Sequence, residues 1–243
     1  MALARINSIN HSTLHTSHST MLNIYERLLQ LPLFQGLSNA DLTALAGQTK
    51  LSFQRFEAGK TIVSDGEVCD RLCFLISGEL SVTAEADDHS YSLTETMTAP
   101  DILQPERIFG LTQRFTRTFT AKTNCNCMTL QKSEVMRLAD EYAVFRINLL
   151  NIVSAQSHRL QRFQWHSQPQ SLDQRIVRFI AERSLRPAGP KLLHIKMTRL
   201  ANELNDSRLN VSQTLNRLQT AGLLTLGRGK IDIPALERLL IAN

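Results

Sequence analysis

Hydrophobic residues recur at helical spacing near the C-terminal end of the chain and predict a pair of helices there. Val211, Leu215 and Leu218 lie three or four residues apart, so they form one stripe on the buried face of a helix. Gly222 is the residue type that ends such a helix. A shorter apolar pattern over Thr198–Leu204 predicts a second helix just before it. Two helices joined by a tight turn have the outline of a helix-turn-helix.

Two short β-prone runs follow these helices and predict a hairpin. Leu223–Leu226 and Lys230–Ile233 flank the turn Gly227–Gly229, which carries Arg228 at its tip. A hairpin in this position is a wing, and its cations are placed to contact DNA phosphates. The C-terminal part of the chain therefore predicts a winged helix-turn-helix.

The outward face of the second helix carries side chains that can read bases. At about 100° per residue, Ser212, Gln213 and Asn216 point away from the buried stripe, together with Leu209, and Arg208 lies in the first turn. In a major groove, Gln pairs with adenine, Arg with guanine and Ser with either, while Leu contacts a thymine methyl group. Any solvated helix has a polar outer face, however, so the pattern alone does not separate DNA binding from a structural helix pair.

The distribution of charge favours DNA binding. The segment 171–243 holds twelve Lys and Arg against six Asp and Glu, whereas the rest of the chain holds fifteen against sixteen. The whole formal charge of +5 therefore comes from a C-terminal domain of charge +6.

Short strands dominate the first half of the chain. Glycines mark turns about every ten residues between Glu57 and Val82, as expected of an all-β roll or barrel. Before them, Met21–Leu31 has a helical pattern and Ser38–Asp41 opens a helix that carries Leu42 and Leu45. The tail 1–20 is rich in Ser, Thr, Asn and His and is expected to be disordered, with Met21 as an alternative start.

The chain resembles the Crp/Fnr superfamily of bacterial transcription factors (cyclic-AMP receptor and fumarate-nitrate regulator). The resemblance rests on L-F-Q-G-L-S at Leu33–Ser38, the run from Gly59 to Val82 with its Gly66–Glu67 and Ser77–Gly78 turns, and the winged segment. It implies an α+β fold, in which an N-terminal cyclic-nucleotide-binding-like jelly roll with flanking helices leads to a long dimerisation helix and the winged helix-turn-helix. The expected parts are a tail (1–20), a β-roll sensor (21–132), a short and a long helix (133–168) and a DNA-binding domain (169–243).

Between the halves, a short helix is expected over Ser133–Asp140 and a long one from Ala143 to about His166. Apolar positions recur along the long helix, although a polar residue interrupts them; the stripe is Phe145, Leu149, Ile152, Gln156, Leu160 and Phe163. A helix packed on its own roll would show the same stripe, but the resemblance implies a dimer seam and a palindromic operator. The next helix is expected over Gln174–Glu182, capped by Ser171–Asp173.

The resemblance also assigns roles within the winged segment. Arg208, Ser212 and Gln213 are expected to read bases, and Ser207 and Asn216 to hold phosphates with the wing cations. The full set of predicted DNA contacts is Thr198, Ser207, Arg208, Leu209, Ser212, Gln213, Asn216, Arg217, Arg228 and Lys230. Double-stranded DNA and a second copy of the chain are the expected partners, and RNA polymerase is a further candidate.

Cyclic AMP is not the expected effector. Nucleotide-binding relatives hold the cyclic phosphate and ribose with a Gly-Glu pair and an Arg-Ser or Arg-Thr pair; aligned from Asp101, this chain has Gln104–Pro105 and Phe115–Thr116 instead. Pro105 also lacks the amide that a buried phosphate requires. A slip of one or two residues would still bring charged side chains into the pocket, and these candidates are Glu106, Arg107, Arg114 and Arg117.

An enzyme is the rival class, because cupin-like barrels also hold metal-dependent oxygenases. Such sites need clustered histidine and carboxylate ligands, and the roll has one histidine, His89, in a polar loop. We therefore expect no catalytic and no metal site. Of the four cysteines, Cys125 and Cys127 lie two residues apart on an expected strand, so their thiols share one face. We favour buried thiols that act as small apolar side chains over a cluster of metal-binding thiolates.

Sensing of redox state, haem or nitric oxide stays an alternative within the same fold. The cysteine group that binds a cluster in oxygen-sensing relatives precedes the roll, and residues 1–68 contain no cysteine. No residue is singled out as a haem ligand. With neither a long apolar run nor a secretory signal, a cytoplasmic location and no membrane contact are expected.

Overall fold

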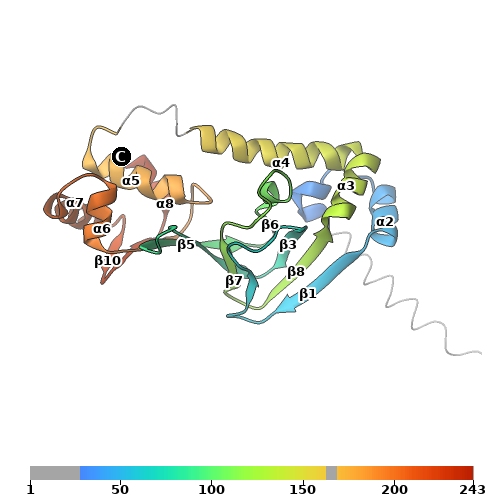
Figure 1. Cartoon of the computed structure of the whole chain (residues 1–243), viewed down its shortest axis with the longest axis horizontal. Helices are drawn as coiled ribbons and strands as arrows, with labels where there is room; N and C mark the ends of the chain where they lie inside the picture. Colours follow the sequence, from blue (N-terminus) through green and yellow to red (C-terminus); the bar gives the residue numbers. More distant parts are fainter. Residues whose placement is uncertain (1–27, 163–168, 243) are drawn as a thin grey trace, which may run out of the picture.

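Two antiparallel sheets form the N-terminal half of the computed structural model, which describes residues 28–162 and 169–242 (Figure 1). One sheet has the order β1-β8-β3-β6, and the roll strands of the other are ordered β5-β4-β7-β2. The strands are β1 (Leu51–Phe56), β2 (Thr61–Val63), β3 (Arg71–Ser77), β4 (Glu79–Glu85), β5 (Tyr91–Thr98), β6 (Asp101–Leu103), β7 (Thr118–Ala121) and β8 (Cys125–Gln131). The predicted all-β roll is confirmed.

Aromatic rings fill the centre of the roll. Phe34 contacts Phe74 of β3 at 5.7 Å and Phe145 at 5.6 Å between ring centroids, and all three side chains are fully buried. Such ring pairs stabilise a core beyond the area that they bury. The first of the three lies in the 3-10 helix η1 (Pro32–Phe34), so the segment before the roll is anchored in the roll's own core.

The Ser77–Gly78 turn joins β3 to β4 and requires glycine. Gly78 has a φ of +96°, and a Cβ there would lie 2.6 Å from the carbonyl oxygen of Asn124 and 2.7 Å from Sγ of Cys125. No other residue fits both the left-handed backbone and this close approach. The turn that carried part of the sequence pattern is therefore fixed by packing against the start of β8.

Helices flank the roll where the sequence predicted them. The helix α2 (Asn39–Gln48) begins with a capping box between Ser38 and Asp41, and Leu42 and Leu45 are buried. The short and long helices are α3 (Lys132–Glu141) and α4 (Ala143–Arg162). The expected tail (1–20), the Met21–Tyr25 part of the first helix, and residues 163–168 lie outside the described residues.

The first three residues of the stripe predicted as a dimer seam on α4 pack on the chain's own roll, whereas Phe163 and the side chain of Leu160 lie outside the described part. Phe145 is fully buried, Leu149 is 7% exposed, and both belong to the roll core, with Ile152 packed against it. The seam assignment is therefore wrong for these residues. Among the α4 side chains that the structure describes, the large apolar ones that are exposed are instead Val144, Ile147 and Leu150, at 38%, 55% and 59%. These positions lie three residues apart and so share another face of the helix.

The C-terminal domain is built around a separate apolar core. Its helices are α5 (Leu172–Arg183), α6 (Met197–Glu203), α7 (Arg208–Thr220) and α8 (Leu236–Ile241), and its strands are β9 (Lys191–Ile195), β10 (Thr225–Gly227) and β11 (Lys230–Ile233). Val211, Leu215 and Leu218 of α7 are buried in this core as predicted. The winged helix-turn-helix is confirmed, whereas β9 and α8 were not predicted.

The strand β9 connects the two halves of the molecule. It pairs with β11 of the wing on one side and with β5 of the roll on the other, so the wing and the roll share one seven-stranded sheet. Figure 1 shows β5 extending from the roll towards the C-terminal domain. The domain boundary predicted near residue 169 is thus crossed by backbone pairing.

No helix within 28–162 or 169–242 is long and apolar enough to cross a membrane.

Candidate DNA-binding surface and ligand cavity

A network of polar contacts fixes the start of α7. The Ser207 hydroxyl accepts from the Asn210 backbone N–H at 3.1 Å and caps the helix. The Asp206 carboxylate accepts from the Ser207 backbone N–H at 2.7 Å, from the Asn210 side-chain amide at 2.8 Å and from the Arg175 guanidinium at 2.5 Å. Ser207 is therefore the N-cap of α7, and Asp206 ties the helix to α5.

These contacts also change the acidity of the Asp206 carboxyl group. The Asn210 amide, followed by the guanidinium of Arg175, lowers the pKa of Asp206 below its usual range. The negative charge is thereby favoured at the positive end of the α7 dipole. The first turn of α7, where the predicted base-reading residues begin, is held in place at neutral pH.

The outward face of α7 is open to solvent. Arg208, Gln213 and Asn216 are exposed, Ser212 is half-buried, and Leu209 is 66% exposed, although it is a large apolar side chain. The helix dipole, the guanidinium and the amide groups together present donors and acceptors with one apolar contact. That combination fits base edges and phosphates in a major groove.

The other predicted contacts surround this face. Thr198, Arg228 and Lys230 are exposed on the start of α6 and on the wing. The wing is anchored to α7, because the Leu226 backbone N–H donates to the Gln219 side chain at 2.6 Å. Arg217 is exposed as well, but its guanidinium pairs with Asp173 of α5.

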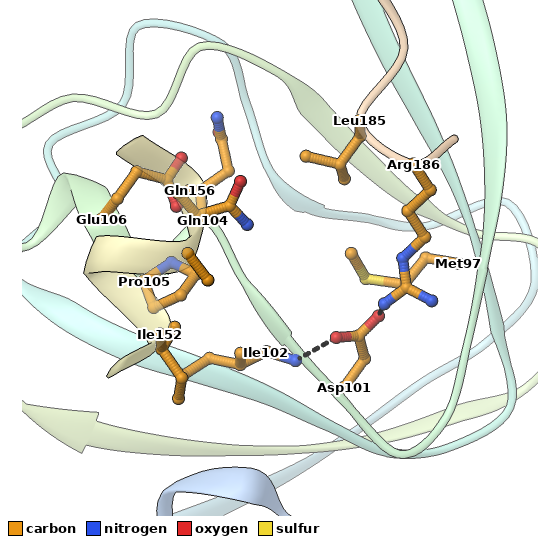
Figure 2. A pocket seen from close by; sticks show the side chains of 11 residues that line it. Met97, Asp101, Ile102, Gln104, Pro105, Glu106, Ile152, Gln156, Leu185 and Arg186 are labelled. Carbon is orange, nitrogen blue, oxygen red and sulfur yellow. Dashed lines mark hydrogen bonds and ion pairs between the residues drawn. The ribbon is translucent and has the colours of Figure 1, made fainter. Parts of the chain in front are cut away.

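A cavity of about 240 Å³ lies where the sensor domain meets the DNA-binding domain, between β6, α4 and the segment that follows α5 (Figure 2). Its floor is the 3-10 helix η2 (Pro105–Arg107). The lining residues are Met97, Asp101, Ile102, Gln104, Pro105, Glu106, Ile152, Ala155, Gln156, Leu185 and Arg186. Roll, long helix and DNA-binding domain thus all contribute to one cavity.

The charged groups of this cavity are two carboxylates and one guanidinium. Arg186 comes from the C-terminal domain and pairs with Asp101, and Figure 2 shows the two side chains together on one side of the cavity. Oε2 of Glu106 is buried and has no hydrogen-bond partner among the described residues, and Oε1 lies 3.7 Å from Nε of Arg107. An unpaired buried acceptor is costly, so a ligand that donates a hydrogen bond would relieve it.

Only Glu106 of the four predicted effector residues lines this cavity. Arg107 is its neighbour on η2; Arg114 donates to the Gly66 carbonyl at 2.7 Å, near the β2–β3 turn. Arg117 donates to Glu95 of β5 at 3.0 Å and to the Arg183 carbonyl. The four residues are therefore distributed over three places.

The side chains at the expected phosphate position bind one another. Gln104 has a left-handed backbone, with a φ of +37°, and its side-chain oxygen accepts from the Thr116 backbone N–H at 3.0 Å. Its side-chain nitrogen donates to the Thr116 hydroxyl at 2.8 Å. The amide that a phosphate would need at this position is therefore already occupied.

The four cysteines are buried, free thiols within the roll. Burial raises the pKa of Cys69 and Cys73 to about 11 and that of Cys127 to about 12. At neutral pH these thiols stay protonated and react slowly. Cys125 and Cys127 share the buried face of β8 as expected, and they act there as small apolar side chains.

Of the cavity residues, sequence reasoning named only Glu106 as an effector candidate, and two of those that it missed come from the other domain. Leu185 and Arg186 are about 80 residues away from Asp101 and Glu106 in the chain and come from the other domain. No local pattern marks them, because their role depends on how the two domains pack. The only local sign of a site was the charged residue Arg186 in a short segment between Ser184 and Pro187.

Two family models match the chain over most of the described part. Residues 53–142 match the cyclic nucleotide-binding domain, and residues 174–240 match the Crp-like helix-turn-helix domain. No curated protein matches the sequence of this chain.

The fold recurs in a solved sensor domain, and further solved structures show a lower similarity. The sensor domain of the transcriptional regulator DNR from Pseudomonas aeruginosa is 18% identical, with a TM-score of 0.51 over 63% of this chain and 99% of that one. The Thermus thermophilus catabolite activator protein is 18% identical, with a TM-score of 0.43 over 86% and 96%. FixK2 from Bradyrhizobium japonicum is 16% identical, with a TM-score of 0.44 over 79% and 96%.

Proposed function

Because this chain belongs to the Crp/Fnr family of DNA-binding transcription regulators, which are not enzymes, we propose that it binds a palindromic operator as a homodimer and answers to a small effector. The observation that carries the DNA-binding part is the exposed outer face of α7 on a domain of charge +6. A steep decrease of affinity with salt follows from such a charge.

Within the operator, we assign the base contacts to Arg208, Ser212 and Gln213, with Leu209 against a thymine methyl group. Their support is exposure on one face of α7 behind a rigid first turn. Phosphate contacts are assigned to Ser207, Asn216 and the wing cations, and Thr198 and Arg217 lie at the margin. Contact with RNA polymerase stays a prediction.

The homodimer is proposed to form along the outer face of α4. Val144, Ile147 and Leu150 are exposed, and a continuous apolar stripe of this kind on a long helix is typical of a helix-helix seam. The inner face is already used by the roll core, so the second copy has this one apolar face of the helix to contact. A two-fold axis along α4 would match the two-fold symmetry of a palindrome.

The effector is proposed to be neutral or cationic, and to carry a hydrogen-bond donor. Two carboxylates and one guanidinium line the cavity, and Glu106 offers an acceptor that lacks a partner among the described residues. A cyclic phosphate would meet Asp101 and Glu106 without a free amide or cation, because Gln104 occupies the Thr116 amide. Cyclic AMP is therefore not the proposed effector.

The protonated, buried thiols speak against a cysteine-based redox sensor. Haem and nitric oxide stay alternative effectors within the same fold. The visible absorption spectrum of the purified protein tests them directly, because a bound haem would give an intense absorption band.

Operator binding is tested by a mobility-shift series on genomic fragments at several salt concentrations, with and without candidate effectors. We expect a preferred fragment that is bound at least about a thousandfold more tightly than random duplex. Absence of any preferred fragment under every condition would contradict the proposal.

Calorimetric titration with cyclic AMP tests the effector assignment. We expect no binding in the micromolar range. Micromolar binding that also tightens operator affinity would prove this part of the proposal wrong and leave the DNA-binding part intact.

A further inference from the structure

The two domains are joined by a strand pair that carries a buried charge cluster. Along β5 and β9, Tyr91 lies opposite Ile195 at one end of the ladder, and Glu95 lies opposite Lys191 at the other. The roll and the DNA-binding domain therefore share backbone hydrogen bonds across their boundary. Movement of one domain relative to the other would first have to separate these strands.

Glu95 lies at the centre of this junction and is 4% exposed. Its carboxylate pairs with Arg117 of the roll at 3.0 Å and with Lys191 of the DNA-binding domain at 2.9 Å. It also accepts from the backbone amides of Leu185 and Arg186, the second at 3.2 Å. One carboxylate thus holds groups from both domains at once.

Because the charged groups of this cluster are buried, the stability of each depends strongly on the presence of the others. The side chains of Glu95 and Lys191 are 3% and 2% exposed, and that of Arg117 is 14% exposed. Removing one partner of a buried ion pair leaves an uncompensated charge, which is far more costly than the loss of a surface pair. The junction is therefore expected to be either fully formed or fully open.

A second set of contacts joins the same two domains near the strand pair. Arg183 lies over the rings of Tyr91 and Phe179 and donates to the Tyr91 hydroxyl at 3.0 Å. Arg199 of α6 pairs with Asp88 of the β4–β5 turn at 3.1 Å. These contacts place the tip of the β4–β5 hairpin directly on the DNA-binding domain.

The formed junction leaves the DNA-binding surface open. Arg208, Leu209 and Gln213 of α7, and the wing tip at Arg228, are exposed while β5 and β9 are paired. A junction that fixes the domain but does not cover its recognition face can preorganise that face for a duplex.

We propose that the β5–β9 junction, centred on Glu95, is a latch that holds the DNA-binding domain in its operator-binding orientation. The latch residues are Glu95, Arg117, Leu185, Arg186 and Lys191. This inference rests on the proposed operator binding. Two rigidly oriented recognition helices match two half-sites at a fixed spacing, and freely rotating ones lose that match.

The ligand cavity lies against the latch and gives it a route of regulation. Leu185 and Arg186 line the cavity, and the same two residues donate their amides to Glu95. A ligand that moves the Arg186–Asp101 pair must therefore also change the support of the latch (Figure 2). A regulatory ligand must bind the latched and the open arrangement with different affinity. The segment Leu185–Arg186 can provide that difference, because it contacts both the cavity and Glu95.

A disulfide that closes the latch provides the first test. Ser92 and His194 lie directly opposite each other on β5 and β9, so the double variant Ser92→Cys/His194→Cys joins the domains covalently on oxidation. All four native thiols are buried, and the pKa values of Cys69, Cys73 and Cys127 are raised, which leaves these three protonated during mild oxidation. The matched control, Thr83→Cys/Thr94→Cys, places the same bond between β4 and β5 within the roll.

The oxidised Ser92→Cys/His194→Cys protein is expected to bind the operator within about twofold of the wild type. Its affinity should also no longer respond to any effector that changes wild-type affinity, whereas the control protein should still respond. Loss of operator binding on closing the junction would overturn the proposal, because the latched arrangement would then not be the operator-binding one.

Opening the latch provides the second test. Glu95→Gln keeps the shape of the side chain and removes its charge, and Glu79→Gln is the control, because Glu79 forms a half-exposed pair with Lys122 within the roll. We expect operator affinity to fall at least about tenfold in Glu95→Gln and to stay unchanged in the control. Wild-type operator affinity in a folded Glu95→Gln protein would overturn the latch.

Combining the changes separates a latch from a merely structural role. In the Glu95→Gln background, oxidation of the Ser92→Cys/His194→Cys pair should restore operator affinity; failure to restore it in a folded protein would contradict the proposal. If Glu95→Gln does not fold, the oxidised pair in the native background decides alone. A wild-type protein without any preferred operator would instead refute the proposed function.

Discussion

The helices α4 and α7 have similar inner faces and different outer faces. Phe145 and Leu149 of α4 are buried in the roll core, and Val211 and Leu215 of α7 are buried in the core of the C-terminal domain. Outward, α4 presents three large apolar side chains, whereas α7 presents polar ones around the single exposed Leu209. The inner faces hold each domain together, and the outer faces indicate the chemistry of the two partners.

An apolar outer face gains free energy by excluding water, so it fits a second apolar helix. A polar, cationic outer face gains by replacing counterions and water on a polyanion, so it fits DNA. Four predictions test whether the two outer faces contact these two different partners.

Removal of the inner-face aromatic ring on α4 should have the largest effect. Phe145 is fully buried and contacts the Phe34 ring at 5.6 Å, so Phe145→Ala should lower the free energy of unfolding by about 3 to 5 kcal/mol. Urea unfolding followed by circular dichroism measures this loss. A destabilisation below about 1 kcal/mol would mean that the inner face of α4 does not belong to the roll core.

Charges on the outer face of α4 should separate the proposed dimer without unfolding its subunits. Ile147 and Leu150 are more than half exposed, so Ile147→Glu/Leu150→Glu costs the single subunit little but buries four carboxylates in the seam of a dimer. Operator affinity should fall by about a hundredfold, since one half-site binds without the other.

Sedimentation measures the oligomeric state of this variant directly. Met136→Glu is the matched control, because Met136 is 53% exposed on α3 rather than on α4. A dimer that persists in the double variant and dissociates in the control would move the seam away from α4.

The sequence predicted the buried and exposed faces of α7 correctly, but it did not separate those of α4. On α7 only one apolar stripe exists, so inside and outside follow from the helical period alone. On α4 two apolar sets interleave, Phe145 with Leu149 and Ile147 with Leu150, and periodicity cannot say which one meets the chain's own roll. The resemblance favoured a seam, and the wrong set was assigned to it.

The junction strand was missed for a related reason. Lys191–Ile195 has only five residues, and its pairing partner β5 lies almost a hundred residues earlier. Strand pairing over such a separation leaves no local signal, since period and turn chemistry act between neighbours. The cavity wall at Leu185 and Arg186 escaped prediction in the same way, whereas the wing, whose strands are adjacent, was predicted.

Substitutions on the outer face of α7 and on the wing should differ in kind as well as in size. Gln213→Ala is expected to cost about 1 to 3 kcal/mol on the preferred operator and to relax the preference at one base pair. Lys230→Ala should weaken preferred and random sequences alike and reduce the salt dependence of binding.

A binding assay on all single-base variants of the operator, repeated at several salt concentrations, measures both effects. The opposite pattern, with Lys230→Ala changing base preference and Gln213→Ala weakening all sequences alike, would exchange the assigned roles.

The smallest expected effect concerns the polar contacts that start α7. The pKa of Asp206 is lowered, first by the Asn210 amide and then by Arg175, so its stabilising contribution is complete above the ordinary carboxyl pKa near 3.8. This contribution is lost as pH falls further, through the lower pKa that Asp206 has in the folded state.

Asp206→Asn removes this contribution at neutral pH, while the new side chain can still accept the Ser207 amide proton. The wild type should therefore be slightly more stable than Asp206→Asn at pH 7, and the difference should vanish only below about pH 4. Thermal unfolding of both proteins across this range measures it; a difference that disappears between pH 5 and 7 would mean that another group controls the start of the recognition helix.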